Sequence, residues 1–91
     1  MPTLNEAIST AVRVQSTRTG VSLGDVATAL GIGRTAFWHR LNNEKPWDTD
    51  DLEKLADSLH LHDGWELVEL ARQEASLSGM QDADQKTPTT R

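Results

Sequence analysis

The chain has 91 residues and a net charge of −5, which is enough sequence for one small domain. It contains no cysteine, so disulfide bonds and cysteine-ligated zinc sites are excluded. No apolar run approaches the roughly 18 residues of a membrane helix, and no signal-peptide core follows Met1. We therefore expect a soluble cytoplasmic protein that does not insert into a membrane.

The first predicted helix runs from Thr3 to about Ser16. Thr3 and Glu6 have the spacing of a capping box, in which each side chain binds the backbone N–H of the other residue. The apolar stripe of this helix comprises Leu4, Ala7, Ile8, Ala11 and Val12. Arg13 and Arg18 lie toward its C-terminal end, where they either complement the helix dipole or contact phosphate.

Residues 22–30 are predicted to form a second, short helix. Ser22 can accept a hydrogen bond from the Asp25 backbone, and Asp25 can accept one from the Ser22 backbone, as a weak capping box. The inner face consists of Val26, Ala27 and Leu30. Gly31 follows at the position where a helix often ends in a left-handed residue, which glycine adopts without steric cost.

A third helix is expected to begin near Gly33 or Arg34, with Phe37 and Leu41 on its inner edge. The small side chain of Ala27 lets the two helices cross closely. An alanine, a glycine four residues later, an aliphatic residue and then a polar-faced helix form a helix-turn-helix pattern.

Residues 43–48 read as a loop, because Pro46 prevents helix formation there. Trp47 is interpreted as a plug over the core, with a base contact as the alternative. Thr49 or Asp48 caps the fourth predicted helix. The inner face of that helix comprises Leu52, Leu55, Ala56 and Leu59.

Asp63 and Glu66 are predicted to cap a fifth helix. Its apolar pattern ends at Leu77, so the helix-turn-helix domain is expected to span residues 1–77. Residues 78–91 are polar and are expected to form a flexible, disordered tail.

The ordered set of helical patterns resembles the DNA-binding domain of the lambda-type phage repressors and their Cro relatives, an XRE-like domain. The residues that carry the resemblance are Ser22, Leu23, Val26, Ala27, Leu30, Gly31, Ile32, Phe37 and Leu41. Residues 51–59 are similar to the helix that follows the recognition helix in that family, and the likeness covers about residues 3–77. It implies an all-α, five-helix lambda-repressor-like fold whose third helix enters the major groove.

Carried over by position, the resemblance makes Arg34 and Thr35 the readers of base edges, followed by Trp38 and His39. An arginine at such a position most often forks onto guanine. The alternative is that Arg34 is a solvated surface residue. Trp38 departs from the family pattern, which usually has a small residue there, and it either presses on a sugar or thymine methyl group or packs in the core.

Candidate phosphate contacts lie at the start of the second helix, where backbone N–H groups point outward, and beyond the end of the third. They are Ser22, Leu23, Gly24, Asn42, Asn43 and Lys45. For Asn42 and Asn43 the alternative role is to cap the end of the third helix.

The distribution of charge favours DNA although the total charge does not. Residues 13–45 carry five cationic and two acidic side chains, a net charge of +3. Residues 48–84 carry two cationic and eleven acidic side chains, a net charge of −9. Because the local field acts on a phosphate backbone, we expect the acidic half to face away from the duplex.

The sequence gives less support to two other kinds of site, a metal site and an enzyme active site. His60, His62 and Asp63 invite a metal-site interpretation, but no further ligand is placed and a linker is favoured. No nucleophile–base pair or phosphate-binding loop stands out, so neither an enzyme nor a cofactor or small-molecule ligand is expected.

The sequence therefore predicts a sequence-specific DNA-binding transcriptional regulator, of the small phage or prophage repressor type, whose partner is an operator in double-stranded DNA. The fifth helix is more widely apolar than one core requires, so Trp65 or Leu70 is expected at the centre of a homodimer interface. The alternative is a protein-interaction module, such as an antitoxin or anti-repressor, that uses the two C-terminal helices and hardly binds DNA.

Overall fold

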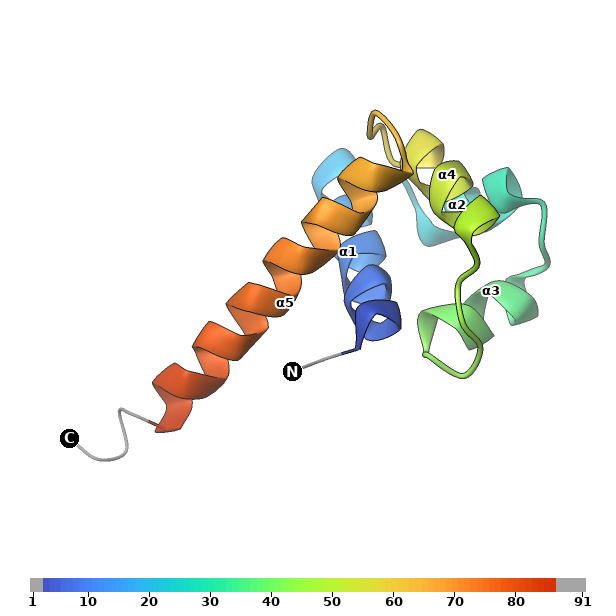
Figure 1. Cartoon of the computed structure of the whole chain (residues 1–91). Helices are drawn as coiled ribbons and strands as arrows, with labels where there is room; N and C mark the ends of the chain where they lie inside the picture. Colours follow the sequence, from blue (N-terminus) through green and yellow to red (C-terminus); the bar gives the residue numbers. More distant parts are fainter. Residues whose placement is uncertain (1–2, 87–91) are drawn as a thin grey trace.

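The computed structural model describes residues 3–86, and the side chains of residues 3–77. Its helices are α1 (Leu4–Thr19), α2 (Leu23–Leu30), α3 (Arg34–Leu41), α4 (Thr49–Ser58) and α5 (Gly64–Lys86). There is no strand within 3–86, so the predicted all-α, five-helix fold is confirmed. The first four helices cluster together, whereas α5 packs against α1 and α4 and then extends away from the cluster (Figure 1). No helix in the described range is both long and apolar enough to span a bilayer.

The predicted capping box at the start of α1 is present. The backbone N–H of Glu6 donates to Thr3 Oγ1 over 3.2 Å, and that of Thr3 donates to Glu6 Oε1 over 2.8 Å. Hydrogen bonds from the Thr3 backbone and then from its side chain lower the pKa of the Glu6 carboxyl. The helix continues past Ser16 and ends at Gly20, which has the left-handed φ of 75°.

Only half of the capping box predicted for α2 forms. Ser22 Oγ accepts from the Asp25 backbone N–H over 3.1 Å, as expected. The predicted bond from the Ser22 backbone N–H to the Asp25 carboxylate does not form, so that part of the prediction is wrong. The Asp25 side chain is instead exposed to solvent. Gly31 ends the helix at a φ of 74°, which confirms its predicted role.

Asp48 rather than Thr49 caps α4, and Asp51 completes a capping box there. The Asp51 backbone donates to Asp48 Oδ1 over 2.9 Å, and the Asp48 backbone donates to Asp51 Oδ2 over 3.2 Å. At the start of α5, Glu66 N–H donates to Asp63 Oδ1 over 2.9 Å, as the sequence predicts.

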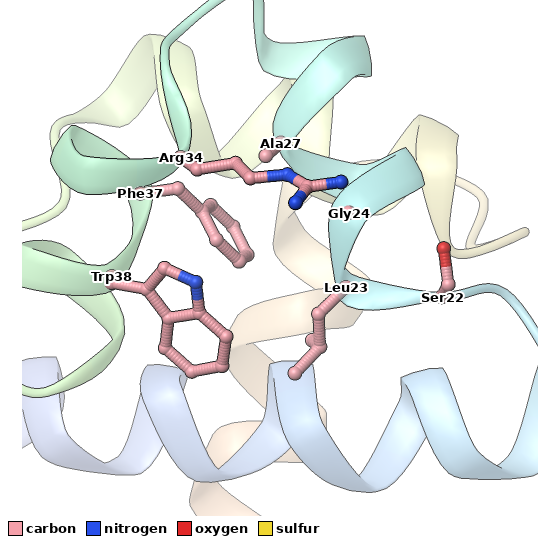
Figure 2. Close-up of a pocket in the computed structure, with 7 residues that line it drawn as sticks. All are labelled: Ser22, Leu23, Gly24, Ala27, Arg34, Phe37 and Trp38. Atoms are coloured by element: carbon pink, nitrogen blue, oxygen red, sulfur yellow. The ribbon is translucent and has the colours of Figure 1, made fainter.

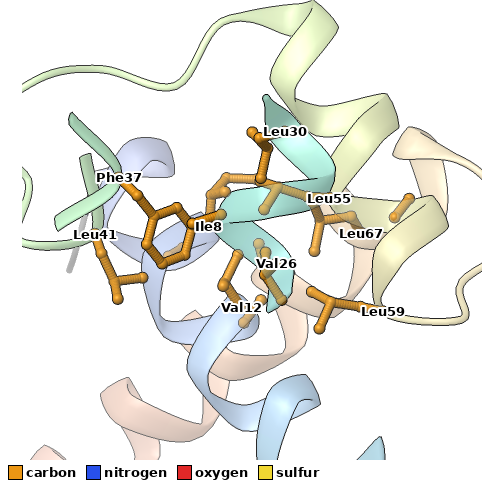
Figure 3. Close-up of a cluster of buried hydrophobic side chains, with 14 of the residues drawn as sticks. Ile8, Val12, Val26, Leu30, Phe37, Leu41, Leu55, Leu59 and Leu67 are labelled. Atoms are coloured by element: carbon orange, nitrogen blue, oxygen red, sulfur yellow. The ribbon is translucent and has the colours of Figure 1, made fainter. Parts of the chain in front are cut away.

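The core lies where the helices meet and contains almost all of the predicted inward faces (Figure 3). Its buried residues are Ala7, Ile8, Ala11, Val12, Val26, Ala27, Leu30, Phe37, Leu41, Leu55, Ala56, Leu59, Leu67, Ala71 and Ala75. Leu4 and Leu52 are the exceptions, since Leu4 is exposed and Leu52 is only partly buried. The buried side chains of α3 join the same cluster, so the core fixes the position of that helix.

The end of α5 differs from the expectation. The apolar pattern predicts an end near Leu77, but the helical backbone continues to Lys86. Helix geometry does not require an apolar face, so the loss of the apolar pattern does not mark the end of the helix. Residues 87–91 of the expected tail lie outside the described residues.

Two core substitutions should destabilise the domain by different means. Leu55→Ala leaves a cavity in the core and should lower the free energy of unfolding by ~2–5 kcal/mol. Ala27→Leu overfills the space beside α3 and should cost ~1–3 kcal/mol. Urea unfolding measures both, with Ala29→Leu as the control on the exposed face of α2. If either core variant is as stable as the wild type, the core described here is incorrect.

Removal of residues 79–91 should leave the stability of the domain unchanged. Among the described side chains, which end at residue 77, the last one buried in the core is that of Ala75, so the deletion removes no described core contact. Thermal unfolding followed by circular dichroism should give the wild-type midpoint within a few degrees. A large fall in the midpoint would place residues 79–91 in the folded unit.

Candidate nucleic-acid interface

The helix-turn-helix is formed by α2, the turn at residues 31–33, and α3. Ile32 is partly buried in the turn and packs against the core. On α3, Phe37 and Leu41 are 1% and 2% exposed, which confirms the predicted inner edge. Thr35 lies on the opposite, exposed side of the helix, so one face of α3 holds the fold and the other is available to a partner.

A hollow of about 320 Å³ lies between α2 and α3, beside the start of each helix (Figure 2). It is lined by Ser22, Leu23, Gly24, Ala27, Arg34, Phe37 and Trp38. Leu23 points toward the Trp38 indole across this hollow, and Arg34 reaches over it toward Gly24. The structure thus brings together the phosphate candidates of α2 and two of the base-reading candidates of α3.

Arg34 extends toward the N-terminus of α2. An ideal Cβ placed on Gly24 would lie 3.8 Å from Arg34 Nη2 and 3.8 Å from Ser22 Oγ. No carboxylate among residues 3–77 lies within ion-pair distance of the Arg34 guanidinium, and the residue is exposed. Because the start of a helix carries partial positive charge, this end of the hollow attracts an anion.

Trp38 is only partly exposed and does not belong to the buried core. Its ring meets Phe37 edge-on, with centroids 6.3 Å apart and planes 70° apart, while 43% of the residue stays exposed. Part of the indole therefore packs beside the core residue Phe37, and the exposed part belongs to the outer surface of α3. That surface is where the resemblance to the repressor family places base contacts.

His39 is less available than the other predicted base readers. Its Nδ1 atom lies 3.1 Å from Glu44 Oε1. The carboxylate occupies one ring nitrogen and adds a negative charge to the C-terminal end of this surface. Thr35 makes no side-chain hydrogen bond in the described chain, and it is exposed, as are Arg34 and Trp38.

The amide oxygens of the two asparagines after α3 are engaged within the protein. Asn42 is the C-cap of α3, and its Oδ1 accepts from Arg13 Nη2 over 3.2 Å. Asn43 adopts a left-handed φ of 66°, and its Oδ1 accepts from Ser9 Oγ over 2.8 Å. These geometries agree with the capping interpretation, while Lys45 remains exposed in the same loop.

Ser9 on α1 is the centre of a hydrogen-bond cluster that the sequence pattern does not reveal. Its hydroxyl accepts from Trp47 Nε1 over 3.0 Å and donates toward Asn43. Asn5 Oδ1 accepts from the Trp47 backbone N–H over 2.8 Å. Trp47 also packs edge-on against Phe37, at 5.9 Å between ring centroids, so it covers the core as predicted. The cluster fastens the loop after α3 to α1.

Arg40 is directed into the protein and does not belong to the outer surface of α3. Its Nε atom lies 3.6 Å from Asp51 Oδ2, and Asp51 is itself buried. Nε and Nη1 of Arg40 are buried without a hydrogen-bond partner in the described chain. This ion pair links the end of α3 to the start of α4, and it leaves Arg13, Arg18, Arg34 and Lys45 as the exposed cations of the basic half.

The two candidate dimerisation residues differ in accessibility. Trp65 is 79% exposed near the start of α5. Leu70 is partly buried and packs against the core, so most of its surface is already used within the domain. Of the two, Trp65 offers the larger surface to a second chain.

The histidine-containing linker shows no ligand cluster. His60 has a left-handed φ of 62°, and the backbone N–H of His62 donates to the Glu66 carboxylate. Over residues 3–77, no three side chains of the metal-binding types are grouped closely enough to hold an ion.

The sequence matches no protein-family model, and no curated protein matches it either. The structure is similar to that of the clp gene regulator ClgR from Corynebacterium glutamicum, with a TM-score of 0.81 and 20% sequence identity. The similarity covers 94% of this chain and 90% of that chain. A second structure of ClgR from C. glutamicum gives a TM-score of 0.71 and 20% identity over 81% of this chain and 95% of that chain. At this identity, the comparison establishes a shared fold.

Proposed function

We propose that this protein is a sequence-specific DNA-binding transcriptional regulator that acts in the cytoplasm. The observation that carries the proposal is the exposed outer face of α3 beside the start of α2, which carries Arg34, Thr35 and Trp38. In a helix-turn-helix, the outer face of the second helix enters the major groove, and the start of the first helix lies against the adjacent phosphates. The fold shared with a clp gene regulator supports the same class of function.

In this proposal α3 enters the major groove. Arg34, Thr35 and Trp38 face base edges, with His39 at the far end of the contact. The backbone N–H groups of Leu23 and Gly24, helped by the Ser22 hydroxyl, hold one phosphate group. At the other end of α3, Lys45 and the amide groups of Asn42 and Asn43 hold the next part of the same strand.

The finer proposal is a small repressor of the phage or prophage type, which blocks a promoter by occupying it. Two copies bind a partly palindromic operator, so that their α3 helices lie about 34 Å apart, one duplex turn. The exposed Trp65 lies at the centre of the contact between the two copies, on the side of the domain that also carries the acidic helices.

One observation favours a second candidate function. The surfaces of α4 and α5 are strongly acidic, and they carry the exposed Trp65. A module that binds protein through these helices, such as an antitoxin or anti-repressor, would use that surface and leave α3 free. Binding to duplexes from a random pool at low and moderate salt separates the two candidates, because such a module selects no sequence.

Arg34→Ala and Lys45→Ala should weaken DNA binding in different ways. Loss of a guanine contact by Arg34 should cost ~1–3 kcal/mol on the preferred site and reduce the preference at one base pair. Loss of a phosphate contact by Lys45 should weaken all duplexes alike and lower the salt slope by about one unit. Titrations against specific and scrambled duplexes at several salt concentrations measure both effects.

Arg72→Ala and Lys54→Ala are the matched controls, since both cations are exposed on the acidic helices. They should leave DNA affinity almost unchanged. If Arg34 stays beside Gly24 on DNA, Arg34→Ala will weaken specific and scrambled duplexes equally, and Arg34 is then not a base reader. A wild-type protein that selects no duplex would reject the proposed function.

Trp65→Ala should weaken the association of two copies on an operator by about 2 kcal/mol or more, the usual cost of truncating a central interface tryptophan. Sedimentation of the protein with operator DNA measures the number of bound copies. Leu4→Ala is the control, because Leu4 is an exposed apolar residue on α1. A single bound copy with an asymmetric footprint would contradict the dimer.

A further inference from the structure

Arg13 connects α1 to Trp38 on α3 and to Asn42, the C-cap residue of that helix. Its guanidinium carbon lies 5.8 Å from the centroid of the Trp38 ring, and its Nη2 atom donates to Asn42 Oδ1 over 3.2 Å. Trp38 and Asn42 are four residues apart and so lie on one side of the helix. One side chain of α1 therefore contacts both the exposed aromatic residue of α3 and the residue that caps its end.

The contacts of Arg13 differ from those of the other described arginines outside the hollow. Arg18 lies 3.6 Å from Glu74, and Arg72 lies 3.8 Å from Glu69, so each of these has a carboxylate nearby. No carboxylate in the described chain lies within ion-pair distance of Arg13. Its contacts are an aromatic ring and a neutral amide.

We infer that Arg13 is a positioning residue that fixes the Trp38 indole for base readout, so that α1 helps to set the sequence preference. The inference rests on the proposed DNA-binding function. Arg13 acts through Trp38 and does not itself read a base.

The physical reason is preorganisation of an exposed side chain. The rings of Phe37 and Trp38 meet in an edge-to-face arrangement, and 43% of Trp38 stays exposed to solvent. A cation within about 6 Å of the ring centroid attracts the ring through its quadrupole. Arg13 is itself held by Asn42, so together with Phe37 it restricts the orientations of the indole and reduces the entropy lost when Trp38 meets a base pair.

A double-mutant cycle tests this inference on DNA. Arg13→Met, Trp38→Ala and the double variant are titrated against the preferred duplex and against duplexes changed at single positions. Arg13→Met should reduce discrimination by about two- to fivefold, the factor that an exposed cation–π contact supplies, at the positions where Trp38→Ala also reduces it. In the Trp38→Ala background, Arg13→Met should cause no further loss of discrimination.

The controls separate positioning from simple phosphate contact. Arg18→Met removes the other exposed cation of α1 and should leave discrimination unchanged, while Arg13→Lys should retain part of it. The inference is overturned if Arg13→Met weakens all duplexes equally and lowers the salt slope by about one unit. It is also overturned if the effects of Arg13→Met and Trp38→Ala on discrimination simply multiply.

A measurement without DNA distinguishes failure of this inference from failure of the proposed function. In protein labelled with 5-fluorotryptophan, the fluorine resonance of Trp38 is identified by its loss in Trp38→Phe. Arg13→Met should shift this resonance and leave that of Trp65 in place, whereas Arg18→Met should shift neither. An unchanged Trp38 resonance would show that Arg13 does not position the ring. If the shift occurs but the wild-type protein binds no duplex, the contact stands and the readout role is rejected.

Discussion

Burial of Phe37 is the interaction on which the position of α3 depends. A helix of 8 residues is not stable alone, so α3 must be held by its neighbours. Phe37 joins the core, and its ring lies in edge-to-face contact with the rings of both Trp38 and Trp47. At the far end of the helix, the Ser9 hydrogen-bond cluster fixes the following loop to α1. The outer face of α3 therefore takes its orientation from the core and from a residue far away in the chain.

The local parts of the fold could be predicted from the sequence because each depends on residues that are close in the chain. Three such local features are confirmed: the capping box of Thr3 and Glu6, the left-handed Gly31 and the inner edge of α3. The end of α5 could not be predicted in this way, because the helical backbone continues to Lys86, beyond the end of the apolar pattern at Leu77. Hydrophobic periodicity predicts which part of a helix faces the core. It does not predict where a helix ends when the helix continues beyond its apolar pattern.

The candidate site was predictable in outline and less so in its contacts. The exposed positions of Arg34 and Thr35 follow from helical periodicity, and the amphipathic pattern of α3 leaves Trp38 at the border of the core. The links from Ser9 to Asn43 and from Arg13 to Trp38 join residues that are far apart in sequence, and local patterns contain no information on such pairs. The burial of Ser9, which requires a hydrogen-bond partner for its hydroxyl, is itself seen only in the structure.

The separation of charge between the two halves of the chain has a kinetic consequence for a protein that binds DNA through α3. The total charge of −5 provides no attraction to a duplex at long range, because exposed charges of either sign act only within about a Debye length, near 8 Å at physiological salt. Within that distance, the exposed cations of the basic half favour binding. A collision is then productive when α3 already faces the duplex, so long-range electrostatic steering contributes little to the association rate. The same charge pattern shortens the residence time of such a protein on unrelated DNA. It would therefore find an operator through many brief encounters rather than through long sliding along the duplex.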